Sequence, residues 1–189
     1  MLEGRDLQEA LDAVHLTSLQ GPFHRYVLHR YIVLALQQGG PLHILSGEWS
    51  LKTGGRFNYP GRNRTTYLAT TARTAQVEAE RVQAPYVHLP IKGKLQHVLD
   101  VTNPGVTALL HILPGELTEN WRMLNARGQE APTQRLGHAA YTSTRVEAIA
   151  YPSTMHSGGV CLAVFPERLV SGSLLEIDDP HEILRERIP

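Results

Sequence analysis

Strand-like and helix-like segments follow one another along this chain without a regular alternation. Segments rich in Val, Ile, Tyr and Thr predict strands, and apolar residues spaced three and four apart predict helices. The predicted strands are 23–36, 65–69, 86–91, 95–101, 146–151 and 159–165, and the predicted helices are 5–19, 72–82, 103–113, 116–124, 134–141 and 181–187. A doubly wound sheet would need strands and helices in strict turn. We therefore expect the α+β class, with mixed, mainly antiparallel sheets and flanking helices.

Glycine-containing turns are expected to separate several of these segments. Gly39-Gly40-Pro41 closes the first strand, and Gly93-Lys94 predicts a turn between the strands on either side of it. Segment 45–64 is crowded with glycine, aromatic residues and arginine, and we expect an ordered loop there. The chain shows no internal repeat and no linker, so residues 1–189 are expected to form one domain.

The composition excludes several functional classes. With 42% hydrophobic and 19% charged residues, the 189-residue chain can bury a core, which argues against disorder. Its 18 basic and 18 acidic residues give a formal charge of zero, so we expect no direct nucleic-acid partner and no attraction to a membrane. The chain has no apolar leader and no run long enough to span a bilayer, which predicts a cytoplasmic protein.

The common catalytic and metal-binding motifs are missing. There is no phosphate loop, no GxGxxG after a strand and no GxSxG turn, which weakens nucleotide-driven chemistry and serine hydrolysis. The ten histidines are scattered without ligand spacing, so no metal is expected. The single cysteine, Cys161, lies in the apolar run 160–165 and is expected to be a buried, inert thiol.

Three segments carry polar residues of types used in catalysis: Gly54-Gly55-Arg56-Phe57-Asn58 with Gly61, Tyr67 to Glu78, and Tyr151-Pro152-Ser153. Taken singly, each has an ordinary structural explanation. Arg56 could be a solvated charge after a turn. Glu78 could pair with Arg81 on a helix surface, and Ser153 could begin a turn.

Together these segments resemble the RES family, which is named for an arginine, a glutamate and a serine. The family pattern has Gly-Gly-Arg-(Trp/Phe)-Asn, a later Gly, Tyr-Leu-Ala, and a Glu eleven residues past the Tyr, a register that fits Glu78 and not Glu80. It continues with Thr-Gln-x-x-Gly, aliphatic-Tyr-Pro-Ser and an apolar strand ending in Phe, matched by Thr133 to Gly137, Ile149 to Ser153 and Leu162 to Phe165. The resemblance spans 22–170, which leaves 1–21 as an N-terminal helical extension and 171–189 as a C-terminal tail.

The chain departs from the family pattern at two positions. Many members carry an arginine two residues after the serine and an asparagine just before the last apolar strand, where this chain has Met155 and Cys161. An arginine on the first core strand is also typical. Arg25 is the closest match, and Arg30 takes that place if the strand register differs.

The resemblance implies a fold similar to ADP-ribosyltransferases and an enzyme that consumes NAD as substrate by breaking the bond between nicotinamide and ribose. The catalytic candidates are Glu78, which would stabilise positive charge on the ribose, and Arg56, which would anchor the pyrophosphate or ribose. Tyr67 would line the pocket. Ser153 would hydrogen-bond the ribose or the carboxylate, since no histidine base is expected beside it. The substrate-binding candidates are Arg25, Asn58, Tyr67 and Ser153.

Family members are toxins of bacterial toxin–antitoxin pairs. The resemblance therefore implies growth arrest by NAD depletion, and a cognate Xre-type antitoxin whose helix-turn-helix domain contacts DNA. No cofactor is expected. The acceptor stays open: water would make a glycohydrolase, inorganic phosphate a phosphorylase, and a protein side chain an ADP-ribosyltransferase. Family precedent favours NAD degradation over protein modification.

Two other kinds of protein remain alternatives. A non-catalytic NAD-binding module would hold its ligand with Arg56 and the glycine loop, and Glu78 would only support the fold. A purely interacting protein would use an aromatic cluster of Trp49, Phe57 and Tyr59, because aromatic residues and arginine are enriched at interfaces. Substitution of Arg56 separates the alternatives, because only the enzyme and the binding module tie that side chain to a small ligand.

Overall fold

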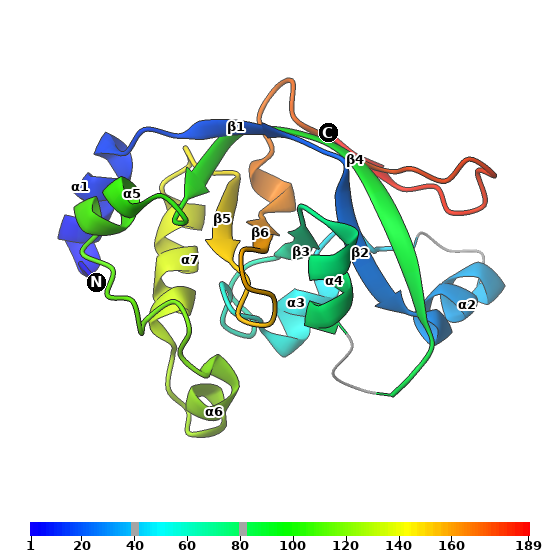
Figure 1. Ribbon diagram of the computed structural model, residues 1–189, viewed down its shortest axis with the longest axis horizontal. Helices are drawn as coiled ribbons and strands as arrows, with labels where there is room; N and C mark the ends of the chain where they lie inside the picture. The colour runs from blue at the N-terminus through cyan, green and yellow to red at the C-terminus, as the bar shows by residue number, and fades with distance from the viewer. Residues whose placement is uncertain (39–41, 80–82) are drawn as a thin grey trace.

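The computed structural model of the chain, which describes residues 1–38, 42–79 and 83–189, combines helices with a single extensive sheet (Figure 1). The strands are β1 (Thr17–Gln20), β2 (Phe23–Leu28), β3 (Thr66–Ala69), β4 (Tyr86–Asp100), β5 (Ala148–Pro152), β6 (Val160–Val164), β7 (Leu174–Ile177) and β8 (Arg187–Ile188). The α-helices are α1 (Gly4–Ala13), α2 (His29–Gln38), α3 (Glu48–Thr53), α4 (Ala72–Ala79), α5 (Pro104–Leu109), α6 (Trp121–Ala126) and α7 (Pro132–Thr142).

The long strand β4 organises the sheet. It pairs antiparallel with β1, β2 and β7 and parallel with β5. From β5 the antiparallel pairing continues through β6 and β3 and returns to β2, so the ladder closes into a circuit. In the described part of the chain, β4 with β5 is the only parallel pair. The expected α+β class with a mainly antiparallel sheet is confirmed.

Both faces of the central strands are buried. Successive side chains of a strand point to opposite faces. In and just after β6, Cys161, Ala163 and Phe165 therefore join one hydrophobic cluster, while Leu162 and Val164 join the other. This burial explains why the segment is apolar at every position instead of alternating. The prediction that Cys161 is a buried thiol is confirmed, since its side chain is 3% exposed.

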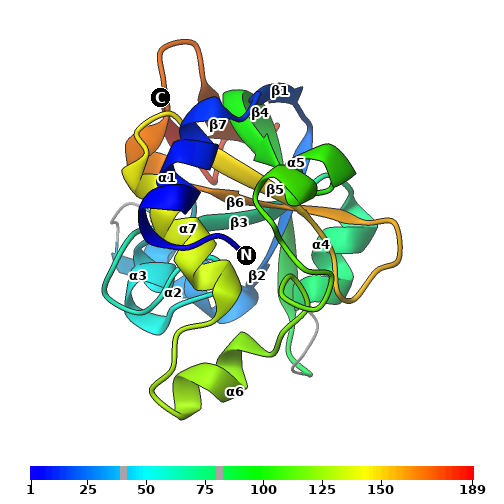
Figure 2. The ribbon, with the colours of Figure 1, turned by 90° about the vertical axis from the view of Figure 1, so that its left-hand side faces the viewer.

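Helices α1 and α7 cover the first cluster (Figure 2). Leu7 and Leu11 of α1 and Leu136 of α7 are buried there. Gly137 faces the backbone of the loop after α3, where an added Cβ would come within 1.9 Å of the Phe57 carbonyl oxygen. Only glycine at this position lets α7 lie directly against that loop.

Both ends of the chain are integral to this architecture. Strand β1 pairs with β4, and α1 supplies buried leucines to the first cluster. Strand β7 also pairs with β4, and its Leu175 is fully buried in the second cluster. Segments 1–21 and 171–189 therefore contribute to the sheet and the core instead of decorating a domain that is complete without them.

The two predicted elements nearest the N-terminus were wrong in extent. The predicted helix 5–19 stops at Ala13, and its last residues form β1, because pairing with β4 replaces the helical pattern there. The predicted strand 23–36 becomes β2 followed by α2. The ladder between β2 and β4 ends where Leu28 meets Tyr86, the first residue of β4, and the chain is then free to coil. The predicted closing turn 39–41 lies outside the described residues.

The predicted turn at Gly93-Lys94 was wrong, since both residues lie within the continuous strand β4. Gly93 serves packing instead of chain reversal. A Cβ there would come within 2.4 Å of the ring of Phe23, which is buried against the strand. A glycine inside a strand often marks such a close approach.

Three predicted helices in the second half of the chain also changed. The helix predicted over 103–113 begins as expected, with the Asn103 side chain accepting from Gly105 N at 2.8 Å, but ends at Leu109. In place of the helix predicted over 116–124, turns lead into α6. The helix predicted over 181–187 is absent. Its backbone N–H groups are instead held in turns by the Asp179 carboxylate, which accepts from His181, Ile183 and Leu184.

Several predictions are confirmed in type and position. Strands β3, β5 and β6 and helix α7 lie where the patterns place them. Helix α4 follows β3, and Thr71 caps it by accepting from Thr74 N at 3.1 Å. The end of the predicted helix 72–82 lies outside the described residues. Segment 45–64 is an ordered loop that contains the short helix α3. In the described part of the chain no helix is long and apolar enough to cross a membrane.

Candidate active site

A cleft of about 500 Å³ opens between the sheet and the surrounding helices. Its size is ordinary for a pocket that binds a small molecule. The lining side chains come from β2, α3 and its following loop, β3, α4 and α6, with Tyr151 and Cys161 supplied by β5 and β6. Four of the residues predicted for the site line it: Arg25, Arg56, Tyr67 and Glu78.

Glu78, in the last turn of α4, meets Ser153 just after β5. The Ser153 hydroxyl donates to Glu78 Oε1 at 2.6 Å, a short, charge-assisted bond. The two residues are 75 positions apart in the chain, and the sheet brings them together because β3, which precedes α4, pairs with β6, which pairs with β5. Of the two partners expected for Ser153, ribose or carboxylate, the structure shows the carboxylate.

The Ser153 hydroxyl makes three hydrogen bonds to Glu78 and its own loop. It accepts from the backbone N–H groups of Met155 at 3.1 Å and His156 at 3.0 Å, in addition to donating to Glu78. A hydroxyl has one donor and two acceptor positions. The expectation for Ser153 was that no histidine base stands beside it, and His156 follows it three residues later, with its backbone N–H bonded to the serine. However, the ring of His156 bonds Thr74 at 2.8 Å and not the serine, so it is not placed as a base for Ser153.

Arg56 reaches from the glycine loop to the segment that precedes α6. Its Nη1 donates to the carbonyl oxygens of Leu117 at 2.8 Å and Glu119 at 3.4 Å, and Nη2 donates to Thr154 Oγ1 at 3.3 Å. These acceptors are neutral. The guanidinium therefore ties three separate segments together at the edge of the cleft while keeping its full charge.

Tyr67 and Asn58 form a buried pair beneath the glycine loop. The Tyr67 hydroxyl donates to Asn58 Oδ1 at 2.7 Å and accepts from Phe57 N at 2.8 Å. Burial raises the pKa of Tyr67 far above its usual value, so the phenol stays protonated. Gly55 is required here, because a Cβ would come within 2.4 Å of the Tyr67 hydroxyl.

The expectation that Asn58 touches substrate does not fit this position. Its side chain is fully buried, and its Nδ2 donates to the Ser50 carbonyl at 2.6 Å. Asn58 does not line the cleft, and its bonds place Tyr67. It is a supporting residue, one that sequence alone could not distinguish from a contact residue.

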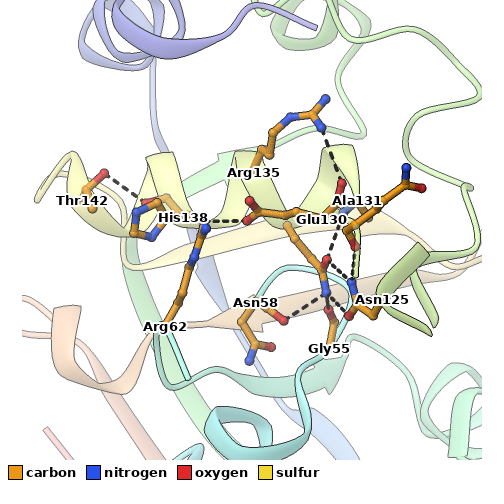
Figure 3. Close-up of polar contacts among 11 residues, drawn as sticks. Gly55, Asn58, Arg62, Asn125, Glu130, Ala131, Arg135, His138 and Thr142 are labelled. Carbon is orange, nitrogen blue, oxygen red and sulfur yellow. Dashed lines mark hydrogen bonds and ion pairs between the residues drawn. The ribbon is translucent and has the colours of Figure 1, made fainter. Parts of the chain in front are cut away.

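Gln134 of α7 holds the glycine loop from behind. Its Nε2 donates to the carbonyls of Gly55 at 2.9 Å and Asn58 at 3.2 Å, and its amide exchanges two hydrogen bonds with the amide of Asn125. Figure 3 shows Gly55, Asn58 and Asn125 facing the same side of α7, with the Arg62–Glu130 ion pair beside them. The Thr-Gln-x-x-Gly element therefore supports the cleft through Gln134, and Gly137 permits the close packing.

Arg25, in β2, also lines the cleft. Its Nη1 donates to the Ile44 carbonyl at 2.6 Å, and burial lowers the pKa of the guanidinium to about 10, which leaves it charged at neutral pH. Glu186 opposes that shift and accepts from the N–H groups of Ile44 and Leu45 at 2.7 and 2.8 Å. Arg30, the alternative, is exposed on α2 and does not line the cleft.

Sequence reasoning missed several lining residues. Trp121 and Arg122 of α6 border the cleft, with the guanidinium 4.3 Å from the indole ring centre. His24 also lines it, and its Nδ1 lies 3.0 Å from Nε2 of His88. No local signal marks these positions, since each is an ordinary residue of a helix or strand. Trp49 lines the cleft, but its expected aromatic cluster was wrong because Phe57 is fully buried.

Two ionisable side chains that line the cleft, the thiol of Cys161 and the phenol of Tyr151, stay protonated. Burial and, secondarily, the negative charge of Glu78 raise the pKa of the Cys161 thiol to about 12. Burial also raises the pKa of Tyr151 well above its usual value. Both groups are therefore neutral at physiological pH and can form hydrogen bonds. Among the residues that the structure describes, no three His, Cys, Asp or Glu side chains gather as a metal site.

Comparison with known proteins agrees with this geometry. The family model described as RES domain matches residues 35–184. A chain of the crystal structure of the M. tuberculosis MbcT-MbcA toxin-antitoxin complex superposes with a TM-score of 0.69 at 24% sequence identity, over 93% of this chain and 91% of that one. No curated protein matches the chain. The family model covers most of the sequence, including the cleft segments that carry Arg56, Glu78 and Ser153, and the chain belongs to the RES domain family.

Proposed function

We propose that this protein is a toxin that consumes NAD by breaking the bond between nicotinamide and ribose. One observation carries the proposal: the arginines Arg25 and Arg56 and the carboxylate Glu78 face a single cleft, and Ser153 holds that carboxylate at 2.6 Å. Positive groups suited to a pyrophosphate and a negative group suited to a ribosyl cation thus share one pocket of about 500 Å³.

Glu78 supplies the chemistry in this proposal. Cleavage of the nicotinamide–ribose bond builds positive charge on the ribose ring, and a carboxylate beside the ring stabilises that charge. Nicotinamide departs as a neutral group from a cationic precursor, so no second carboxylate is needed to protonate it. Ser153 acts by orienting Glu78, because its hydroxyl is already committed to that side chain and to two backbone groups.

The two arginines bind the charged part of the substrate. A guanidinium is planar and always charged, and its several donors match phosphate oxygens. Arg56 enters from the loop after α3, and Arg25 enters from β2, so a pyrophosphate between them would be held from two sides. Tyr67 lines the same cleft with a ring fixed by Asn58, which offers a rigid surface for a planar base or ribose.

The partner in this proposal is a protein antitoxin. The structural neighbour was solved as a toxin–antitoxin complex, and the resemblance to RES toxins implies an Xre-type antitoxin with a helix-turn-helix domain. That antitoxin would supply the DNA contact, which suits a chain whose basic and acidic residues balance at 18 each. In this proposal the toxin acts in the cytoplasm and consumes the NAD of the cell that makes it.

Nicotinamide release tests the activity. Purified protein is incubated with NAD, with and without inorganic phosphate, and free nicotinamide is measured by chromatography. We expect release by the wild type and its loss in Glu78→Gln. Glu9→Gln, an exposed carboxylate paired with Arg5 on α1, is the matched control and keeps full activity. ADP-ribose as co-product identifies water as acceptor, and a phosphorylated ADP-ribose identifies phosphate.

Two outcomes would contradict the proposal in different ways. If labelled ADP-ribose is transferred to protein in a cell extract but the purified protein alone consumes no NAD, the protein is an ADP-ribosyltransferase. Saturable NAD binding without any turnover would make it a binding module.

A growth experiment tests the toxin itself. In bacteria, expression of the wild type should arrest growth and expression of Glu78→Gln should not. Equal growth of the two strains would argue against a toxin.

A further inference from the structure

A second contact holds the Ser153 loop on α4. His156, in the loop that joins β5 to β6, places its ring Nδ1 at 2.8 Å from Thr74 Oγ1. Thr74 and Glu78 are four residues apart on α4, so their side chains lie on the same face of the helix. One loop is therefore tied to one helix face at two points: Ser153 to Glu78, and His156 to Thr74.

The Thr74 contact is built into the interior. Thr74 is fully buried, and its hydroxyl also lies 2.8 Å from Thr71 Oγ1, which caps the same helix. Gly159 closes the loop by donating to the His156 carbonyl at 2.9 Å. A Cβ on Gly159 would come within 2.7 Å of Thr74 Oγ1 and 2.8 Å of His156 Nδ1. The glycine therefore leaves the space that the Thr74–His156 contact occupies.

These contacts form one mechanical path to the carboxylate. The backbone N–H of His156 donates to Ser153 Oγ, so the position of His156 helps to fix the direction in which the serine hydroxyl points. That hydroxyl donates to Glu78 Oε1. Movement of His156 away from α4 would turn or release the serine, and Glu78 would lose the hydrogen bond from Ser153.

We propose that His156 and Thr74 are positioning residues that set the orientation of Glu78 through Ser153. This inference rests on the proposed function, because it assigns the contact a role in turnover. Neither residue touches substrate in this account. The consequence is a defect in the rate of the chemical step without a matching defect in substrate binding.

The test compares isosteric and conservative variants in the nicotinamide-release assay. Thr74→Val keeps the buried volume and removes the hydroxyl, and Thr74→Ser keeps the hydroxyl. We expect Thr74→Val and His156→Ala to lower kcat roughly tenfold, the order of effect of a lost supporting hydrogen bond, with KM changed less than about twofold. Thr74→Ser and His156→Asn, which retain a polar atom near the original position, should restore most of the rate.

Wild-type kcat in Thr74→Val would overturn the inference, and so would an equal loss in Thr74→Val and Thr74→Ser, which would indicate a packing defect. Amide hydrogen exchange at Met155 and His156 supplies a readout independent of activity, because both amides donate to Ser153 Oγ. Exchange should accelerate in Thr74→Val. If the wild type releases no nicotinamide, the proposed function fails, and unchanged exchange in Thr74→Val would overturn the positioning path as well.

Discussion

Glu78 and Glu147 are two glutamates in contrasting surroundings. Glu147, just before β5, is fully buried, and its two oxygens accept from the backbone N–H groups of Gln96, His97 and Val170 and from the Ser173 hydroxyl. Glu78 is half-buried at the wall of the cleft, and Ser153 donates to one of its oxygens. One carboxylate is enclosed by donors on all sides, and the other faces a pocket.

The contrast separates a structural carboxylate from the carboxylate that we propose acts on the substrate. A buried charge is tolerated only where hydrogen bonds replace its lost hydration, and around Glu147 those donors come from two separate chain segments, 96–97 and 170–173, that the carboxylate joins. A carboxylate that faces a cleft can instead direct its charge at a ligand. Substitution of the two glutamates should therefore damage different properties of the protein.

The largest effect is expected on turnover in Glu78→Gln. The amide keeps the shape and still accepts from Ser153, but it removes the negative charge that is proposed to stabilise the ribosyl cation. Nicotinamide release should fall by at least about 100-fold, the order seen when one electrostatic group is removed from an active site. The free energy of unfolding, measured with denaturant, should change by less than about 0.5 kcal/mol. A large loss of stability would erase the contrast with Glu147.

The next effect is on stability in Glu147→Gln. The amide turns an N–H₂ group toward backbone N–H donors and removes the charge that they solvate. We expect a loss of about 2–4 kcal/mol in the free energy of unfolding, measured by chemical denaturation. Turnover per folded molecule at low temperature should stay at the wild-type level. A selective loss of activity with unchanged stability would show that Glu147 also serves the cleft.

A third glutamate, Glu186, has a role between the structural one of Glu147 and the catalytic one proposed for Glu78. Glu186 accepts from Ile44 N and Leu45 N and thereby holds the segment to which Arg25 is bonded. Glu186→Gln should raise KM for NAD about threefold with little change in kcat, because one supporting bond is weakened while Glu78 is untouched. Glu182→Gln, an exposed residue paired with Arg185 in the same tail, is the control. Equal kinetics in the two variants would remove Glu186 from the site.

A last effect concerns alkaline pH. Burial raises the pKa of Cys161 to about 12 from 9.0, and the pKa values of Tyr67 and Tyr151 are also raised. A raised folded pKa contributes stability that is complete below the unfolded pKa and is lost as pH rises past it. The free energy of unfolding should therefore fall by about 1 kcal/mol between pH 8 and 10 through Cys161. Cys161→Ala should flatten this decline, and an unchanged slope would assign it to other groups.

The local elements of the site were predictable because their patterns are short-range. Strand β3, the Thr71 cap and helix α4 follow one another between residues 66 and 79, and β6 is uniformly apolar. Such signals depend on side-chain period and on backbone donors a few residues away. The candidates Arg56 and Glu78 were identified through the resemblance to the RES family, whose pattern sets their distances from the glycine pair and Tyr67.

Other features depended on partners far along the chain. Gly93 indicates a turn until Phe23, 70 residues earlier, is packed against it. Asn58 looks like a ligand contact until Tyr67 and Ser50 occupy its side chain. Glu186 bonds Ile44 across 142 residues, and no sequence pattern in segment 171–189 predicts that contact. Trp121 lines the cleft within a segment that Arg56 and Gln134, both distant in the chain, bond at Leu117 and Asn125.

The sequence by itself determined the fold class, the family and the candidate residues of the site, since apolar period and motif spacing are properties of neighbouring positions. The tertiary structure alone decided where those residues lie and which groups they bond. It joined Ser153 to Glu78, and it placed Asn58 behind the cleft and Arg25 in its wall. The physical reason is that a hydrogen bond needs its two atoms within about 3 Å in a suitable direction, a condition that chain position does not encode.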